Sequence, residues 1–513
     1  MSESTKIVPF AKLAGRVAAL RRKGKKIVHC HGTFDLIHPG HLFHFEEAKA
    51  KGDVLVVTAT AGKFVKKGPG RPYFNDGLRA KSLAALAAVD LVSLVPHPAA
   101  KEAIEAVRPH VYCKGTEYRE RLGDVTGKLP EDIATVRKVG GSMAYVGSVV
   151  FSSSRILQSH FDHRSEALEA FCRRIRRHTP VEKLRKLFEE FSRLRIVVVG
   201  DVIFDRYSTV TIQGLTSKNR IMSGRFLGEE TQAGGALAVY RHLREFAPKT
   251  SIVGVVGCEP WVKALLQASL HRTGDALVRD GSYTSVLKQR FVEPVSEGKE
   301  LSKVFSVNYL EEGELSARLE RAVLQKLRRL VPRADAVLVM DFGHGVMTQA
   351  VRNYLQSHAS LLVINCQTNS NNFAFNLINR RYRRADAFAL DSAEIHLAAG
   401  KKEIVFEREL KNLGQFLRAR YGWLTRGCVE TLGWTPKGGF VRCEPLAKIV
   451  VDTVGAGDAF ISLATLGVAT RLPPDVITLL GQLAGAEAVG IIGNERPVSK
   501  AGILKGAITL LSS

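Results

Sequence analysis

The chain has 513 residues, 45% of them hydrophobic, so it is long enough for two or three packed domains and lacks the composition of a disordered or fibrous protein. Its 74 Lys and Arg against 50 Asp and Glu give a formal net charge of +24, which favours anionic partners without choosing among nucleotides, sugar phosphates and nucleic acid. The seven cysteines show no CxxC spacing and the apolar runs are strand-sized, so we expect reduced thiols, a cytoplasmic location and no membrane partner.

From Lys26 onward, short β-branched runs alternate with runs of helical pattern. The strand-like runs are 26–34, 53–60, 91–95 and 110–115, and helices are expected to begin at His41, Asp76 and Ala99. This alternation predicts an α/β domain with a parallel, Rossmann-like sheet over residues 1–160.

The pattern changes over residues 161–193, where apolar residues recur at three- and four-residue spacing. Pro180 interrupts this segment and divides it into two helices, which we interpret as an inter-domain connector. A new strand, RIVVVGDVIFDRY, begins at Arg195 and opens a second α/β domain over residues 194–513. The sequence therefore predicts two unrelated α/β domains in tandem.

The first motif with chemical content is HGTFDLIHPGHL, residues 31–42. It places a turn of small residues after a strand and then two histidines, His38 and His41, at the start of a helix. Free backbone N–H groups and the helix dipole make such a start an anion site. Two imidazoles there can stabilise the charge that develops when an α-phosphate is attacked, so we expect His38 and His41 to be catalytic.

This string strongly resembles the HxGH nucleotidyltransferases, which include cytidylyltransferases and heptose-1-phosphate adenylyltransferases. Further likenesses are a basic loop with Lys63, Lys66 and Lys67, an arginine before a helix ending in A-V-D, the KGTEY segment, and the serine-rich FSSSRIL. Among the three loop lysines we favour Lys66 and leave the other two open. The resemblance implies nucleotide-contacting roles for Thr33, Phe34, Lys66, Arg79, Lys114, Ser152 and Ser153.

The second motif is DTVGAGDAF, residues 452–460, a glycine-rich turn that follows a strand and opens a helix. Its glycines let backbone amides approach a phosphoryl group, and the helix start supplies an anion hole. Asp458 is placed to take the proton from a sugar hydroxyl as that hydroxyl attacks the γ-phosphate, so we expect it to be the catalytic base.

The full motif resembles the ribokinase-like, or phosphofructokinase-B, family of carbohydrate kinases. Other segments match in family order: VVVGDVIFDRY, AGGAL, LKQRF, DFGHG and LTRG. The resemblance implies nucleotide contacts from Arg426, Gly427, Thr453, Gly455, Ala456 and Gly457, and sugar contacts from Asp201, Asp205, Gly234, Gly235, Arg290 and Asp341. Glu394 is a weak candidate for a metal ligand.

The chain departs from the family pattern in three places. Ala238 stands where the family has Asn, and Asn365-Cys366-Gln367 replaces a D-P-K triplet. The T-P-N segment has become Leu390-Asp391-Ser392. Such changes alter the polar groups offered to a substrate, so either the kinase domain takes a different sugar phosphate or its activity has weakened. The turn with Asp458 is intact, which favours a changed substrate.

The two resemblances together point to the bifunctional heptose-7-phosphate kinase and heptose-1-phosphate adenylyltransferase family, which makes ADP-heptose for lipopolysaccharide, with the domain order reversed. We expect a bifunctional enzyme that uses ATP and Mg²⁺. The alternative is a transferase that could use CTP and a polyol phosphate, with a kinase-like domain acting as a sensor or scaffold. A homo-oligomer is compatible with this reading. The densest basic stretches, residues 21–26, 173–177 and 380–384, lack interleaved aromatics spaced for base stacking and make a nucleic-acid partner unlikely.

Overall fold

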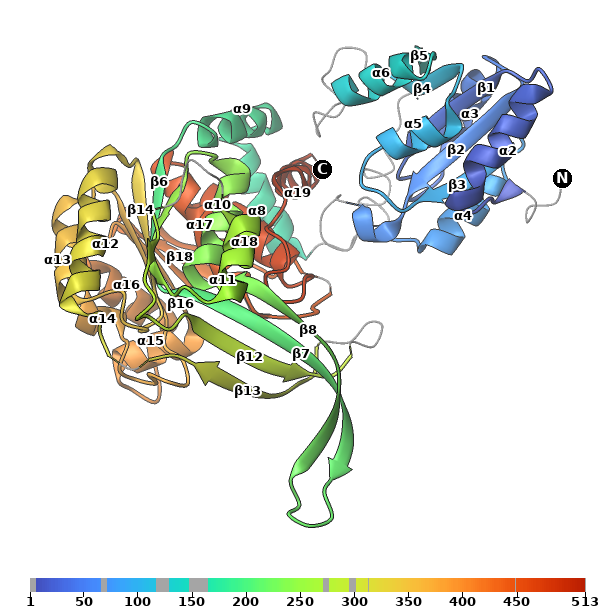
Figure 1. Ribbon diagram of the computed structural model, residues 1–513. Helices are drawn as coiled ribbons and strands as arrows, with labels where there is room; N and C mark the ends of the chain where they lie inside the picture. The colour runs from blue at the N-terminus through green and yellow to red at the C-terminus, as the bar shows by residue number, and fades with distance from the viewer. Residues whose placement is uncertain are drawn as a thin grey trace. The chain divides into compact units, whose positions relative to one another are not determined.

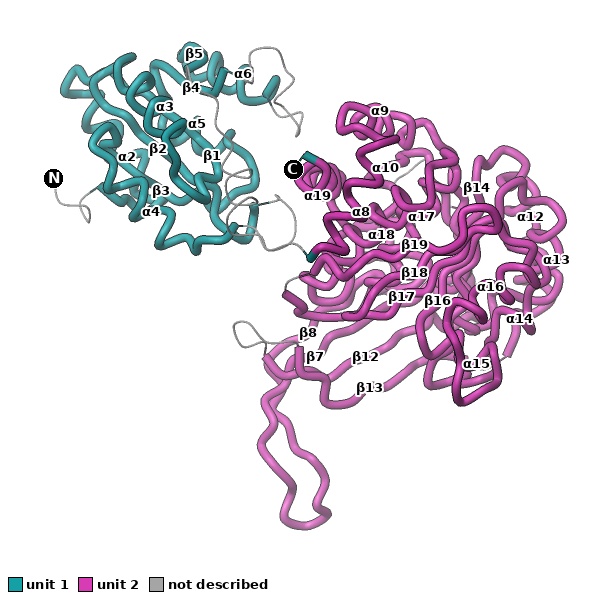
Figure 2. The backbone as a smooth tube through the Cα atoms, turned by 180° about the vertical axis from the view of Figure 1, so that it is seen from behind, with its two compact units in different colours: residues 1–165, 512–513 teal, residues 166–511 magenta. Residues whose placement is uncertain are grey.

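The computed structural model describes residues 6–65, 72–116, 129–146, 165–270, 276–294, 301–311, 313–447 and 449–512. The chain divides into two compact units (Figure 2): unit 1 is Met1–Ser165 with Ser512–Ser513, and unit 2 is Glu166–Leu511. Both units mix helices with largely parallel sheets, which confirms the expected α/β class. Among the described helices, none has the length and apolarity needed to cross a bilayer.

Unit 1 is built on a five-stranded parallel sheet in the order β3-β2-β1-β4-β5 (Figure 1). Its strands are β1 Ile27–Gly32, β2 Val54–Thr60, β3 Leu91–Val95, β4 Val111–Gly115 and β5 Ser142–Val146. Its helices are α2 Phe10–Arg22, α3 Pro39–Lys49, α4 Asp76–Ala84, α5 Lys101–Val107 and α6 Leu129–Lys138, with a 3₁₀ turn η1 at Gly62–Phe64. The strand order reverses beside β1, and the cleft outside such a point is where doubly wound sheets bind ligands.

Unit 2 has an eight-stranded main sheet in the order β19-β18-β17-β16-β15-β14-β6-β9. These strands are β6 Ile196–Gly200, β9 Ser251–Val253, β14 Ala336–Asp341, β15 Leu362–Cys366, β16 Ala387–Asp391, β17 Tyr421–Thr425, β18 Thr431–Thr435 and β19 Gly439–Cys443. The six neighbouring strands β9, β6, β14, β15, β16 and β17 are parallel. Strand β18 pairs antiparallel with both β17 and β19.

A second sheet of unit 2, in the order β13-β12-β7-β8, projects from the main body (Figure 1). It comprises β7 Val202–Leu215, β8 Met222–Gly234, β12 Val286–Val292 and β13 Lys303–Tyr309, and a short pair is formed by β10 Val255–Val256 and β11 Val278–Arg279. The predicted single strand RIVVVGDVIFDRY is therefore two strands in two sheets. Gly200 makes the change of sheet possible, because its φ is +150° and a Cβ there would overlap the Met340 carbonyl.

Helices cover both faces of the main sheet (Figure 1). They are α8 Glu166–Arg176, α9 Val181–Phe191, α10 Gly235–Phe246, α11 Pro260–Ser269, α12 Ala317–Leu330, α13 Gln349–His358, α14 Ile378–Arg381, α15 Ser392–Ala399, α16 Phe406–Phe416, α17 Ala456–Ala469, α18 Pro474–Ala488 and α19 Lys500–Leu511, with a 3₁₀ turn η3 at Val331–Arg333. On one face, the buried Trp423 donates from Nε1 to Thr478 Oγ1 on α18 at 3.0 Å.

The segment expected to connect the domains forms helices α8 and α9. Both are strongly amphipathic and bury apolar residues such as Phe171, Ile175, Leu184 and Phe188. They contact α18 and α19, and the division of the chain places them in unit 2. Arg174 and His178 bind the carboxylate of Asp475 on α18, each at 3.1 Å, which ties this helical pair to unit 2.

Candidate functional sites

The first candidate site lies where β1 ends and the chain turns into α3. Gly32 ends the strand, and a Cβ at this position would approach the Phe34 ring to 2.9 Å. Phe34 has a positive φ of 47° and is buried, and its ring meets the His41 ring edge-on at 5.4 Å. The predicted residues Thr33 and Phe34 thus form the turn itself, and Phe34 packs beneath a predicted catalytic histidine.

The structure brings His38 and His41 together at the start of α3. His38 is the N-cap residue, Pro39 follows it, and the His38 carbonyl accepts from the His41 N–H at 2.8 Å. The two imidazole rings stack with centroids 3.9 Å apart and planes 25° from parallel. Both rings lie at a helix start, where backbone N–H groups and the helix dipole favour a bound anion.

Arg79, predicted to contact the nucleotide, is almost fully buried on α4. Its guanidinium donates to the Thr33 carbonyl at 2.5 Å and to the Thr60 carbonyl at 2.8 Å, and it pairs with Asp76 at 2.6 Å. These contacts join the ends of β1 and β2 to α4. The guanidinium therefore braces the turn that carries the histidines.

Lys114, near the end of β4, lies on the opposite face of the sheet from Cys113 and its core. Its Nζ pairs with the buried carboxylate of Asp132 on α6 at 3.1 Å and lies 5.6 Å from the Tyr112 ring centroid. Lys114 is half-buried and lies near the carboxyl end of its strand. Doubly wound sheets bind ligands at this edge.

A buried row of polar side chains runs along β1 and β2 behind this turn. Thr58 Oγ1 contacts both His29 Nε2 and His31 Nδ1 at 2.8 Å, and Thr60 Oγ1 contacts His31 Nε2 at 3.2 Å. Burial holds the pKa of His29 well below its usual value. One hydroxyl donates only once, so Thr58 couples the tautomers of the two histidines.

Some predicted transferase residues fall outside the described part of the chain. These are Lys66, Ser152 and Ser153, together with the alternative Lys67. Lys63 is described: it is exposed on the short turn η1, and its Nζ lies 5.0 Å from the Phe64 ring centroid. Their roles remain predictions from the resemblance.

The second candidate site is centred on the glycine-rich turn before α17. Asp452 fixes this turn: its buried carboxylate accepts from Tyr207 Oη at 2.8 Å, Lys303 Nζ at 2.7 Å and two backbone N–H groups, those of Val454 and Gly493. Burial opposes ionisation, but these donors hold the pKa of Asp452 below its usual value. The turn is thereby attached to strands β7 and β13 of the second sheet.

The predicted residues Thr453, Gly455, Ala456 and Gly457 form the turn and the first residues of α17. Gly455 is the N-cap with a φ of +86°, and a Cβ there would overlap the Asn494 amide. At Gly457 a Cβ would meet no atom within 4 Å, so the backbone is open to an approaching group at this helix start. This arrangement suits a phosphoryl group bound by backbone N–H groups.

Asp458 is buried in the first turn of α17. Its Oδ1 accepts from Gln367 Nε2 at 3.1 Å. Burial raises the pKa of Asp458 to about 7, and the nearby Asp205 acts in the same direction, whereas Gln367 and Lys288 oppose it. A carboxylate with this pKa can take up a proton near neutral pH, as the predicted base requires.

Asp205 and Arg290 lie side by side in the second sheet, where they form an ion pair between β7 and β12. Gly234 allows this, because a Cβ there would overlap the Asp205 carboxylate. Gly235 has a φ of +51° and begins α10 against the Asp201 carbonyl. The structure therefore groups four of the predicted sugar-site residues, Asp205, Gly234, Gly235 and Arg290.

Asp201 and Asp341, two further predicted sugar-site residues, are buried inside unit 2 and accept hydrogen bonds there. The Asp201 carboxylate accepts from the N–H groups of Phe342, His344 and Val346 at 2.9 to 3.2 Å, and so shapes the DFGHG loop. Burial, with a contribution from Asp341, raises the pKa of Asp201 to about 6. Both residues are fully buried, so their described contacts are structural.

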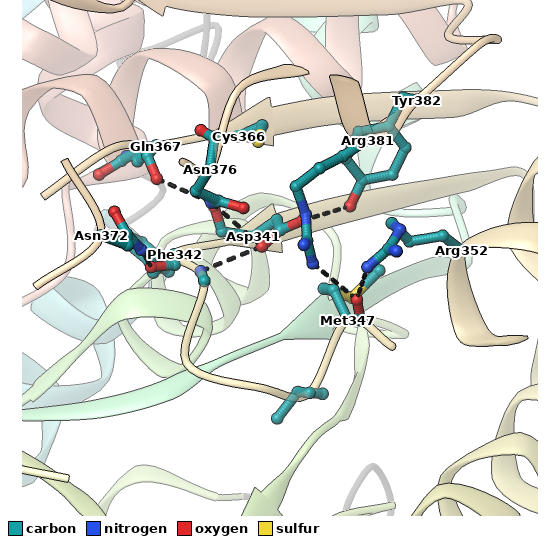
Figure 3. Close-up of polar contacts among 12 residues, drawn as sticks. Asp341, Phe342, Met347, Arg352, Cys366, Gln367, Asn372, Asn376, Arg381 and Tyr382 are labelled. Atoms are coloured by element: carbon teal, nitrogen blue, oxygen red, sulfur yellow. Dashed lines mark hydrogen bonds and ion pairs between the residues drawn. The ribbon is translucent and has the colours of Figure 1, made fainter. Parts of the chain in front are cut away.

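Figure 3 shows Asp341 at the centre of a polar cluster after β14. Its carboxylate accepts from Tyr382 Oη at 2.7 Å, Arg381 Nε at 3.0 Å and Asn376 Nδ2 at 3.3 Å. Asn376 also donates to the Gln367 carbonyl at 2.9 Å. Arg381, which belongs to the basic run of residues 380–384, thus has a structural partner inside unit 2.

Arg426 and Gly427 lie in the hairpin between β17 and β18. Arg426 pairs with Glu430 at 2.6 Å and stacks over the Phe406 ring with its Cζ 4.5 Å from the centroid, while Gly427 has a φ of +52°. Residues 427–429 at the tip of the hairpin are exposed, and Arg426 and Glu430 beside them are half-buried. Arg426 is therefore held in place by Glu430 and Phe406.

Glu394, the weak candidate for a metal ligand, is already hydrogen-bonded within unit 2. It forms a capping box with Asp391 at the start of α15, and it also accepts from the Thr368 backbone. Burial, with Asp391 contributing, raises its pKa to about 8, which keeps the carboxyl protonated at neutral pH. Within the described residues, no group of three or more His, Cys, Asp or Glu could hold a metal ion.

Sequence reasoning missed two side chains of the second site. Lys288 on β12 is paired in register with Asp205, and its Nζ lies 5.8 Å from the Phe342 ring centroid. Burial lowers the pKa of Lys288, while Asp205 and Asp458 act in the opposite direction. Lys288 shares a face of its strand with Arg290, and that period of two was visible in the sequence. Gln367 was noticed only as a replaced lysine.

Comparison with known proteins gives a family match within unit 1 and a likeness of fold for unit 2. Residues 29–158 match the family model described as cytidylyltransferase-like. Unit 2 has a ribokinase-like fold: phosphofructokinase-2 from Escherichia coli, in complex with substrates and products, matches with a TM-score of 0.50 and 13% identity, over 62% of this chain and 99% of that one. At this identity the likeness establishes the fold alone.

Among named proteins, the chain is similar to "Bifunctional protein HldE". It is 38% identical to the protein of Magnetococcus marinus over 144 residues, or 27% of this chain and 30% of that one. It is 42% identical to the protein of Koribacter versatilis over 156 residues, or 30% of this chain and 31% of that one. The chain therefore spans about a third of the length of these relatives.

Proposed function

We propose that the chain is a bifunctional sugar-activating enzyme. Unit 1 transfers a nucleotidyl group to a sugar-1-phosphate and releases pyrophosphate, and unit 2 uses ATP to phosphorylate a sugar or a sugar phosphate. The observation that carries the proposal is the stacked pair His38 and His41 at the start of α3, within a cytidylyltransferase-like domain.

In the proposed transferase, the α-phosphate of the nucleotide lies over the start of α3. A phosphate oxygen of the sugar-1-phosphate attacks the α-phosphorus, and the bond to the bridging oxygen breaks as pyrophosphate leaves with its electron pair. His38 and His41 donate to the phosphate oxygens as negative charge accumulates, and Arg79 holds the turn in place. The resemblance of the KGTEY segment to the heptose-1-phosphate adenylyltransferases supports ATP as donor and a product such as ADP-heptose.

In the proposed kinase, Asp458 accepts the proton of the acceptor hydroxyl, whose oxygen attacks the γ-phosphorus while ADP leaves. The open backbone at Gly457 and the start of α17 receive the transferred group. Asp205 and Arg290 line the acceptor side. Mg²⁺ would accompany the nucleotide and neutralise phosphate charge; Glu394 is not proposed as its ligand.

A second candidate keeps only the transferase active, with CTP and a polyol phosphate as further possible substrates and unit 2 as a sensor or scaffold. The observation favouring it is that Gln367 contributes a neutral amide beside Asp458 where the resembling kinases have an ammonium group. The two candidates differ in whether unit 2 turns over ATP.

The test measures pyrophosphate release from ATP and from CTP with a panel of sugar-1-phosphates, beside ADP release with a panel of sugars and sugar 7-phosphates. We expect His38→Ala and His41→Ala to abolish pyrophosphate release and spare ADP release, and Asp458→Asn to do the reverse. His44→Ala, one turn further along α3, is the matched control and should retain activity. Loss of both activities from one change would contradict separate sites.

A further inference from the structure

The carboxamide nitrogen of Gln367 donates two hydrogen bonds, one of them to Asp458. Its Nε2 donates to Asn365 Oδ1 at 2.6 Å and to Asp458 Oδ1 at 3.1 Å. Asn365 Nδ2 donates in turn to the Ala389 carbonyl on β16 at 3.1 Å. An amide nitrogen carries two N–H groups, so this geometry engages both of them.

The backbone of Gln367 is fixed as well as its side chain. Its N–H donates to the Asp341 carbonyl at 2.9 Å, and its carbonyl accepts from Asn376 Nδ2 at 2.9 Å (Figure 3). Asn376 is buried and is joined to the Asp341 carboxylate. Gln367 is thus held from β14, β15 and the following loop, and it offers a rigid donor to Asp458.

A donor that cannot accept distinguishes the two protonation states of a carboxyl group. The N–H of Gln367 favours an ionised Asp458, with Oδ1 as the acceptor, and leaves Oδ2 to receive a proton. We propose that Gln367 is a positioning residue for the base of unit 2, holding Asp458 in one orientation and in its ionised form. The inference deepens the proposed kinase function and rests on it for its catalytic meaning.

Other charged groups act on Asp458 from the elements packed around it. Asp205 on β7 disfavours its ionisation, whereas Lys288 on β12 favours it. Asp458 in turn contributes to raising the pKa of Glu394 on α15. Gln367 is the group among these that makes a direct hydrogen bond to the carboxylate. Its effect is therefore separable from the others by changing Gln367 alone.

The first experiment needs no substrate. The free energy of unfolding is measured against pH for the protein with Asp458 and with Asp458→Asn, each in the wild-type and Gln367→Met backgrounds. Because burial makes ionised Asp458 costly, the Asp458→Asn variant becomes more stable relative to the protein with Asp458 as pH rises. This difference in unfolding free energy stops growing, and reaches a plateau, at the pH where Asp458 is ionised in the folded state. Without the Gln367 donor, we expect that plateau to move up by roughly one pH unit.

Two further variants test the direction of the plateau's shift and provide a control. Gln367→Lys keeps a donor and adds a positive charge, so the plateau should move to lower pH. Gln415→Met, an exposed glutamine on α16, is the matched control and should leave the plateau in place. An unchanged plateau in Gln367→Met would overturn the inference whether or not unit 2 has activity.

The second experiment applies when ADP release is found with an acceptor. The acidic limb of kcat/KM should then move to higher pH in Gln367→Met by the same amount as the plateau. A purely structural role would lower kcat at every pH without moving the limb, and that result would also overturn the inference. If ADP release is absent with every acceptor, the proposed kinase fails while the stability experiment still decides the role of Gln367.

Discussion

The buried charged side chains at the two sites are of two kinds. Some are bound by partners inside their own unit, and others lie where a substrate is proposed to bind. Arg79, Asp201 and Asp341 are held by backbone and side-chain partners in their own units. Asp458 and Lys288 lie where substrate is proposed to bind. Replacing members of the first kind should therefore change stability before it changes chemistry.

We expect Arg79→Met to destabilise unit 1 by about 2–4 kcal/mol, because two buried carbonyls and Asp76 lose their partner. Urea unfolding followed by far-ultraviolet circular dichroism measures this loss. Arg137→Met, an exposed arginine on α6, is the matched control and should cost little. Unchanged stability with weakened nucleotide binding would instead support a direct contact.

Glu394 should make the stability of unit 2 depend on pH. Its folded pKa, raised to about 8, exceeds the ordinary 4.5, so the folded state binds the proton more tightly between these values. Its contribution to stability therefore falls as pH rises from about 4.5 to about 8, by at most about 1.4 kcal/mol per unit.

Glu394→Gln removes this titration and keeps an acceptor for the Asp391 N–H. The variant should gain stability over the wild type across that interval, as measured by denaturant unfolding at several pH values. Glu190→Gln, an exposed carboxylate on α9, should change stability little. A constant difference for Glu394→Gln across the interval would show that this carboxyl is not protonated in the folded state.

The sequence identified His38, His41 and Asp458 as candidates because each lies in a long motif at the start of a helix. It could not show that Gln367 reaches Asp458, since 91 positions separate them and only the folded sheet brings them together. It also placed Arg79 at the nucleotide from its neighbours alone. Whether an arginine faces a ligand or the interior depends on carbonyls contributed by distant strands.

At the scale of elements, the alternation of strands and helices in unit 1 was readable because each strand is short and bounded by turns. The passage from β6 to β7 was not, because Gly200 and Asp201 interrupt an otherwise continuous β-branched run. The sequence gives the same pattern for one bent strand and for two strands in different sheets. The contact of Gly200 with the Met340 carbonyl decides between them.

Gly200→Ala should prevent unit 2 from folding or cost it more than about 3 kcal/mol, because the added Cβ overlaps backbone and the φ of +150° is strained for alanine. Gly457→Ala should keep or slightly raise stability, since its Cβ meets nothing within 4 Å. Thermal unfolding compares the two. Gly457→Ala should nevertheless reduce ADP release, because the methyl group stands where a phosphoryl group is proposed to bind.

At the scale of the whole chain, each unit has hydrophobic clusters made only from its own residues. Helices α8 and α9 belong to unit 2, although their helical periodicity was interpreted as that of an inter-domain connector. The reason is that amphipathic periodicity shows that a helix has an apolar face without showing which surface covers it.

Differential scanning calorimetry should therefore resolve two transitions. Arg79→Met should lower one of them, because it removes contacts within unit 1, and Gly200→Ala should lower or abolish the other, because it introduces an overlap within unit 2. One transition that moves as a whole in both variants would show that the units unfold together.

The tryptophans give the chain a built-in optical label. Trp261, Trp423 and Trp434 all belong to unit 2, and Trp423 sits in the core with its indole N–H bonded to Thr478. Emission excited at the red edge of the indole band therefore originates from unit 2, whereas tyrosine emission includes unit 1. A nucleotide titration followed in both bands would reveal, without any attached dye, whether unit 2 responds to the ligand.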